Sequence, residues 1–163
     1  MTEASRLEQG LSTAARERFD AAAVVRGCVE GYRLAYAPRS FEMSVPDQPL
    51  SVSGAPDLLA QMLDKLVENA VDFATRGTPI RISLTGDARL RVENHGAALP
   101  DAIRESLFDS MVSLRSEHPG GVPHLGLGLY IARLIAEFHG GVLRAENLPG
   151  GGAAFEAQLA RAV

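Results

Sequence analysis

Four polar residues in one stretch of the sequence have the spacing of a single helix face. Lys65, Glu68, Asn69 and Asp72 lie at positions i, i+3, i+4 and i+7, opposite the apolar side of the segment that begins at Pro56. An asparagine between carboxylates can orient a hydrated Mg²⁺, which prefers oxygen ligands and keeps several of its waters. The same spacing fits a solvated face with offsetting charges, so the stripe alone leaves both interpretations open.

A second candidate lies in the stretch HLGLGLYIARLIAEFHGG, which begins at His124. Gly126 and Gly128 stand at the start of a helical pattern that stops at Gly140 and Gly141. Free N–H groups at a helix N-terminus attract anions such as phosphate, and glycine removes the Cβ atoms that would keep the anion away. A tight turn with a close helix–sheet contact explains the same glycines. The expected apolar face of this helix comprises Leu127, Tyr130, Ile131, Leu134, Ile135 and Phe138.

The third candidate is Asn94, which ends the strand-like run LRVEN and precedes His95 and Gly96. Its amide can hydrogen-bond the polar edge of a flat ring, although an ordinary Asn-x-Gly turn accounts for the same residues. His118 and His124 have no acidic or thiol partner at the spacing of metal ligands, so no zinc site is expected.

Alternating patterns along the chain predict the elements that hold these residues. Asp20 caps a helix that runs to about Tyr36, and Pro56 opens one that runs to about Ala74. A short helix is expected over residues 101–108. Strands are expected in FEMSV, LSVS, the hairpin PIRISLTGDARLRVEN, GVLRAEN and AAFEAQLA. This order predicts an α/β (α+β) two-layer sandwich, with a mixed, largely antiparallel sheet and helices packed on one face.

Composition limits the classes of function. The 163 residues, 46% of them hydrophobic and 22% charged, are typical of one soluble globular domain. A net charge of -4 without a basic run argues against a nucleic-acid binder. The single cysteine, Cys28, excludes an intrachain disulfide, and its apolar surroundings suggest a small core residue. Without an apolar run of membrane-spanning length or a signal-peptide pattern, no direct membrane contact of this chain is expected.

Taken in order, five segments resemble the motifs of the ATP-binding domain of sensor histidine kinases. LLAQMLDKLVENAVDFA is similar to the N-box, VENHGAALP to the first glycine box and LFDSMVSLR to the F-box. HLGLGLYIARLIAEFHGG is similar to the second glycine box, and PGGGAAFEAQL to the closing glycine motif and last strand. The resemblance covers about residue 20 to the C-terminus. It implies the Bergerat ATP-binding fold, an α/β sandwich shared with DNA gyrase, Hsp90 and MutL ATPases.

The resemblance implies a site that binds ATP and Mg²⁺. Asn69 would bind Mg²⁺ and act in catalysis together with Arg115, which would contact the phosphate tail. Asn94 would take the adenine-reading position, where the family usually has aspartate. The other residues that the resemblance assigns to the nucleotide site are Lys65, Asp72, Gly96, Ala98, Leu99, Gly126, Leu127, Gly128 and Leu129.

Four positions depart from the family pattern. Asn94 keeps one acceptor oxygen but lacks charge, so somewhat weaker adenine binding is expected. Ala98 replaces a frequent second glycine, and Asp72 stands where many relatives carry a phosphate-binding lysine. Lys65 lies where the ATP-hydrolysing relatives place a glutamate base. Because a lysine does not accept a proton at neutral pH unless its pKa is strongly lowered, this position favours phosphotransfer over hydrolysis.

The implied function is the catalytic domain of a two-component sensor histidine kinase, which transfers the γ-phosphoryl group of ATP to a histidine on a separate dimerisation domain. None of His95, His118, His124 and His139 lies in a motif like H-E-x-R/K-T-P, so little or no autophosphorylation is expected of this chain. The implied partners are that histidine-bearing dimerisation domain of the same kinase and a response regulator.

Residues 1–19 would be the remnant of a linker or dimerisation helix, and residues 20–163 the catalytic domain. The expected location is cytoplasmic, with the full-length protein attached to the inner membrane through segments absent here.

An alternative is a catalytically degenerate nucleotide-binding or scaffolding domain of the same fold, which the departures at Asn94, Ala98 and Asp72 support. A hydrolase or protein-folding ATPase is less favoured because of Lys65. The glycine- and proline-rich loop predicts mobility over residues 113–124 without nucleotide. A monomer is expected, since the family dimerises through the domain missing here.

Overall fold

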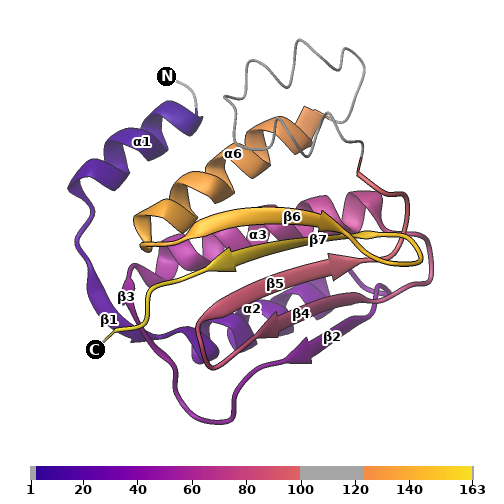
Figure 1. The fold of residues 1–163 in the computed structure, drawn as a ribbon, viewed down its shortest axis with the longest axis horizontal. Coiled ribbons are helices and arrows are strands. Elements are labelled where there is room, and N and C mark those ends of the chain that lie inside the picture. Colours follow the sequence, from indigo (N-terminus) through magenta and orange to yellow (C-terminus); the bar gives the residue numbers. More distant parts are fainter. Residues whose placement is uncertain (1–2, 100–122, 163) are drawn as a thin grey trace.

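The computed structural model describes residues 3–99 and 123–162 (Figure 1). In these residues the elements are α1 (Glu3–Thr13), β1 (Glu17–Asp20), α2 (Ala21–Ala35), β2 (Phe41–Ser44), β3 (Ser51–Gly54), α3 (Pro56–Phe73), β4 (Ile80–Leu84), β5 (Arg89–Asn94), α6 (Pro123–Phe138), β6 (Val142–Asn147) and β7 (Ala153–Gln158). The predicted helices that begin near Asp20 and Pro56 are confirmed, as are the strands predicted by alternation.

One sheet of five strands forms a layer of the molecule, in the order β2-β4-β5-β7-β6. β2 runs parallel to β4, and the other three neighbouring pairs are antiparallel. Figure 1 shows α2 and α3 behind the sheet, with α6 beside α3. This confirms the predicted two-layer sandwich with a mixed, largely antiparallel sheet.

A smaller sheet joins β1 to β3, with Phe19 opposite Val52. β1 was not predicted, because its sequence ERFD is short and mostly charged and shows no alternation. Asp20 ties this sheet to α2: its Oδ1 accepts hydrogen bonds from the backbone N–H groups of Ala22 and Leu50, at 3.0 and 2.9 Å. The predicted cap is confirmed.

α6 begins earlier than the glycine pattern indicates. Its first residue is Pro123, so Gly126 lies in the first turn and Gly128 in the second. Proline suits the first position of a helix, because its fixed φ matches and its missing N–H would have no partner within the helix. The predicted end is confirmed: the helix stops at Phe138, and Gly140 has a φ of 79°.

The core lies between the sheet and α2, α3 and α6, and α6 contributes a wider apolar surface than predicted. Leu129, outside the predicted face, is fully buried, whereas Tyr130 is half-buried. The Tyr130 hydroxyl donates a hydrogen bond to Glu8 Oε1 at 2.7 Å, because α1 packs along this side of α6. Cys28 is partly buried against the core.

Some predictions concern parts of the chain that the structure does not describe. The short helix over 101–108 lies outside the described residues, as does the segment 113–122 of the predicted mobile loop. Within residues 3–99 and 123–162, no helix is both long and apolar enough to cross a membrane.

Candidate functional site

α3 and α6 pack against each other in opposite directions, which brings two of the candidate segments together. At one end, the backbone N–H of Ala55 reaches the ring of His139. At the other end, a Cβ atom built on Gly128 would lie 3.9 Å from Lys65 Cβ and 4.0 Å from Asn69 Nδ2. Lys65, Asn69 and Gly128 therefore meet in the structure.

The room around Gly128 bears on why a glycine stands at this position of α6. Distances of 3.9–4.0 Å are ordinary van der Waals contacts, so the described residues leave room for a methyl group here. Close packing between α3 and α6 therefore does not explain this glycine. A ligand approaching the backbone of α6 would.

Asn69 is the polar side chain at the centre of this region. It is 1% exposed, and its Nδ2 has no hydrogen-bond partner among the residues that the structure describes. An unpaired buried polar group costs about 1–3 kcal/mol, so natural proteins rarely keep one without a partner. This amide is thus suited to an added ligand.

The predicted polar stripe on α3 is divided between two neighbours. Lys65 and Asn69 adjoin α6, whereas the charges of Glu68 and Asp72 act on Tyr36 at the end of α2. Burial raises the pKa of Tyr36, and the negative charge of Glu68 adds to the increase, followed by those of other α3 carboxylates. Asp72 is exposed.

Asn94 lies at the end of β5 and points inward. It follows Leu90 and Val92 on the strand face that packs against the helices, and it is 2% exposed. Its Nδ2 donates a hydrogen bond to the carbonyl oxygen of His95 at 3.3 Å. The inward position is compatible with the predicted base-reading role, and the hydrogen bond of Nδ2 is to the neighbouring residue.

Gly96 has a structural explanation of its own. Its φ is 151°, and a Cβ atom there would lie 2.4 Å from the carbonyl oxygen of Phe73. Gly96 pairs with Ala74, and Thr75 N–H donates to the carbonyl oxygen of His95 at 2.8 Å. The glycine therefore lets the exit of β5 pack against the end of α3, with or without a ligand.

The turn between β6 and β7 approaches the same segment from the other side. A Cβ atom on Gly152 would lie 2.1 Å from the carbonyl oxygen of Asn94. The side chain of Asn147 bonds both backbone groups of Leu99. Asn147 was not among the residues predicted from the sequence, since its partner is 48 residues away and no local motif marks the contact.

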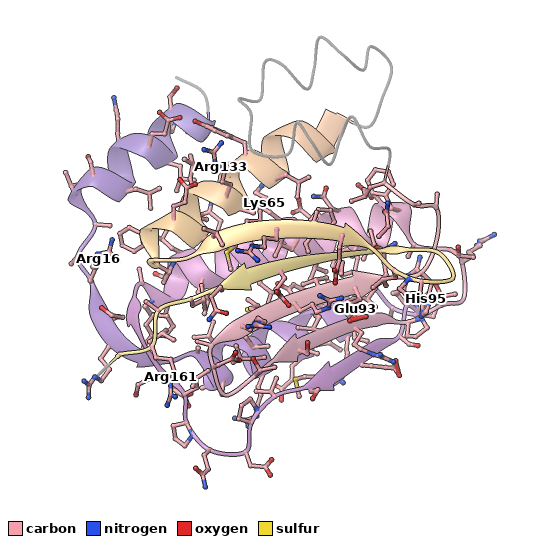
Figure 2. The ribbon with its side chains drawn as sticks, in the orientation of Figure 1. Arg16, Lys65, Glu93, His95, Arg133 and Arg161 are labelled. Atoms are coloured by element: carbon pink, nitrogen blue, oxygen red, sulfur yellow. The ribbon has the colours of Figure 1, made fainter. Side chains whose placement is uncertain are left out.

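The remaining predicted residues are placed as follows. Ala98 is exposed, while Leu99 and Leu129 are buried. Gly126 and Leu127 lie in the helical backbone of α6, and Arg115 lies outside the described residues. In Figure 2, Lys65 appears where α3 and α6 adjoin, and His95 beyond the end of β5. The candidate site is thus framed by α3, α6 and the exit of β5.

A separate hollow of about 480 Å³ lies between α1 and the first turns of α3. It is lined by Leu7, Gly10, Leu11, Leu58 and Gln61, among others. Asn69, two turns beyond Gln61, is not part of its lining. This hollow is therefore distinct from the candidate site.

Residues 54–163 match the family model described as "Histidine kinase-, DNA gyrase B-, and HSP90-like ATPase". The chain is 33% identical to sensor protein KdpD of Escherichia coli (strain K12) over 120 residues, which are 72% of this chain and 13% of KdpD. It is 30% identical to sensor protein ChvG of Rhizobium meliloti (strain 1021) over 162 residues, or 92% of this chain and 28% of ChvG. The chain thus spans well under half of these curated relatives.

The fold is also similar to solved structures. The mycobacterial sensor histidine kinase MprB superposes with a TM-score of 0.75 at 23% sequence identity, covering 90% of this chain and 98% of that chain. This similarity supports the predicted fold independently of the sequence motifs.

Proposed function

Since this chain belongs to the family of histidine kinase-, DNA gyrase B- and HSP90-like ATPases, we propose that it is the ATP-binding catalytic domain of a two-component sensor histidine kinase. It transfers the γ-phosphoryl group of ATP to a histidine on a separate dimerisation domain. The observation that carries the proposal is the buried amide of Asn69 next to Gly128 of α6, because its Nδ2 has no hydrogen-bond partner in the described part of the chain.

The residues present fit a bound Mg²⁺. Asn69 is buried between two helices, and its Oδ1 is the ligand type that Mg²⁺ prefers. Its Nδ2, which has no partner among the described residues, is a donor suited to a phosphate oxygen beside the metal. When bound, the metal ion supplies positive charge that neutralises phosphate oxygens during phosphoryl transfer. Holding it is the role that we assign to Asn69.

The chain's own groups position the nucleotide. Backbone N–H groups in the first turn of α6 bind phosphate oxygens, and Asn94 accepts a hydrogen bond from the adenine amino group. Arg115 stabilises charge on the phosphate tail. Lys65 supplies no carboxylate that could activate water at this position, which favours transfer to the partner histidine over hydrolysis.

Calorimetric titration of the chain with Mg-ATP and Mg-GTP tests the site. We expect wild type to prefer ATP, and Asn69→Ala and Asn94→Ala each to weaken ATP binding by about tenfold, the loss of one to two hydrogen bonds. Gln61→Ala is a matched control on α3, two turns from Asn69, and should bind like wild type. Absence of binding to folded wild type would contradict the proposal.

Transfer is tested with a dimerisation domain supplied in trans and ATP labelled at the γ-position. We expect label on the histidine of that domain and none after its substitution by glutamine. Binding without transfer would instead favour a nucleotide-binding or scaffolding domain, which the departures at Asn94, Ala98 and Asp72 support. In the kinase that we propose, a response regulator would receive the phosphoryl group from that histidine, and the protein would be cytoplasmic and attached to the inner membrane through other segments.

A further inference from the structure

Asn147 makes a paired contact outside the strand ladder. Its Oδ1 accepts a hydrogen bond from Leu99 N–H at 2.7 Å, and its Nδ2 donates to the carbonyl oxygen of Leu99 at 3.2 Å. The side-chain amide thus binds the backbone of Leu99 as a neighbouring strand would. Leu99 is 6% exposed and closes the segment that begins at Asn94.

The sheet register shows what this contact spans. Asn94 of β5 pairs with Ala153 of β7, and Ala153 pairs on its other side with Asn147 of β6. Asn94, Ala153 and Asn147 therefore form one row of paired residues across β5, β7 and β6. An asparagine stands at each end of this row, with the small Ala153 between them. Residues 95–99 leave β5 at Asn94 and reach Asn147, so the segment is attached at both ends of that row.

The contact is not needed for the β6–β7 turn itself. That turn has its own backbone bonds: Leu148 N–H donates to Gly152 O at 3.0 Å, and Gly151 N–H donates to Leu148 O at 3.2 Å. The Asn147 amide is directed instead to a residue far away in the sequence. The amide therefore attaches Leu99, and the segment before it, to the end of β6.

We propose that Asn147 is a positioning residue for the base end of the nucleotide site, an inference that rests on the function proposed above. Both bonds need one donor and one acceptor on the same short side chain, which an amide provides. Asn147 bonds Leu99, at the end of the segment that includes Asn94 and Gly96. It therefore governs how tightly and how selectively adenine is held, and it does not act on the phosphates.

Asn147→Ala and Asn147→Asp test this role, with Gln158→Ala as the matched control. Gln158 is a second side-chain amide bound to backbone, donating to the carbonyl oxygen of Asp87 at 2.7 Å at the other end of β7. Amide hydrogen exchange of Leu99 and calorimetric titration with Mg-ATP, Mg-ADP and Mg-GTP are measured on the whole chain for each variant.

For Asn147→Ala we expect faster exchange at Leu99 and about tenfold weaker binding of both ATP and ADP, the equivalent of one to two hydrogen bonds. The ratio of the affinity for ATP to the affinity for GTP should fall. Asn147→Asp keeps the shape and the acceptor but loses the donor, so an intermediate loss is expected. Gln158→Ala should leave all three affinities unchanged.

Two results would overturn the inference and leave the proposed function standing. In the first, Asn147→Ala speeds exchange at Leu99 but binds ATP like wild type. In the second, ATP binding falls much more than ADP binding, which would place the effect at the phosphates. Failure of folded wild type to bind any adenine nucleotide would overturn the proposed function, and this inference with it.

Discussion

The buried polar side chains at the two ends of the α3–α6 pair differ in whether their polar atoms are hydrogen-bonded. At the His139 end, every polar atom of the side chain has a partner. The ring contacts Ile135 O through Nδ1 at 2.9 Å, and its Nε2 accepts a hydrogen bond from Ala55 N–H at 3.2 Å. Gly54 provides the space for the ring, since a Cβ atom there would lie 2.1 Å from His139 Cδ2.

At the Asn69 end, the same two helices leave an amide nitrogen without a partner in the described part of the chain, and Gly128 leaves room beside it. The His139 end is a complete structural joint. The Asn69 end keeps a polar atom that residues 3–99 and 123–162 do not satisfy. Retaining such a group is expected where a ligand supplies the missing contacts.

The largest difference should appear when each polar side chain is removed. His139→Ala leaves Ala55 N–H without its partner and opens a cavity, so it should lower the free energy of unfolding by about 3 kcal/mol. Asn69→Ala removes an amide whose Nδ2 has no partner among the described residues, so its effect should stay within about 1 kcal/mol. Urea unfolding of both variants measures the contrast, and equal losses would show that Asn69 is an ordinary core residue.

A smaller contrast should follow when one methyl group is added at each end. Gly54→Ala pushes a Cβ atom into the His139 ring and should cost about 2 kcal/mol. Gly128→Ala has room and replaces a helical glycine, so it should be neutral or stabilise by up to about 1 kcal/mol. Thermal unfolding tests both.

The mechanism at Gly54 is checked by a double variant. If the His139 ring causes the cost, then Gly54→Ala should be much less costly in a His139→Ala background. If the losses of unfolding free energy in the two single variants simply add in the double variant, the clash between the new Cβ atom and the His139 ring is contradicted. Calorimetry on Gly128→Ala completes the comparison: nucleotide binding should weaken although the fold is not destabilised.

The contrast also explains which features could be read from the sequence. Asp20, Pro56 and Gly140 mark helix ends through local backbone chemistry, and those ends were predicted. The resemblance to known motifs indicated the fold and directed attention to Asn69 and Asn94. Asn69 is buried within the expected helix, α3, and Asn94 is buried at the end of the expected strand, β5.

Features that depend on distant contacts could not be predicted from local patterns. Asn147 is an unremarkable strand end until its bonds to Leu99 are seen. Tyr130 fits the apolar period of α6, but α1 gives its hydroxyl a partner and makes that side a second interface. β1 is a strand only because β3 supplies its partner.

The smallest predicted effect is a pH dependence confined to the His139 end. Burial lowers the pKa of His139 below its ordinary value of 6.5, and the charge of Arg16 adds to the lowering, while hydrogen bonds of the ring act in the opposite direction. The unfolded chain therefore binds the proton more readily than the folded one. The stability that neutral His139 provides is complete above about pH 6.5 and declines as the pH falls toward the lower folded pKa.

Unfolding free energies of wild type and His139→Gln between pH 5 and 8 measure this dependence. The difference between the two proteins should be greatest above pH 6.5 and should shrink below it, because only wild type loses a neutral imidazole bond on protonation. Asn69→Ala is the control from the other end, since an amide does not titrate in this range. If the difference in unfolding free energy between wild type and His139→Gln is constant across this range, protonation of His139 does not weaken the contact between α3 and α6.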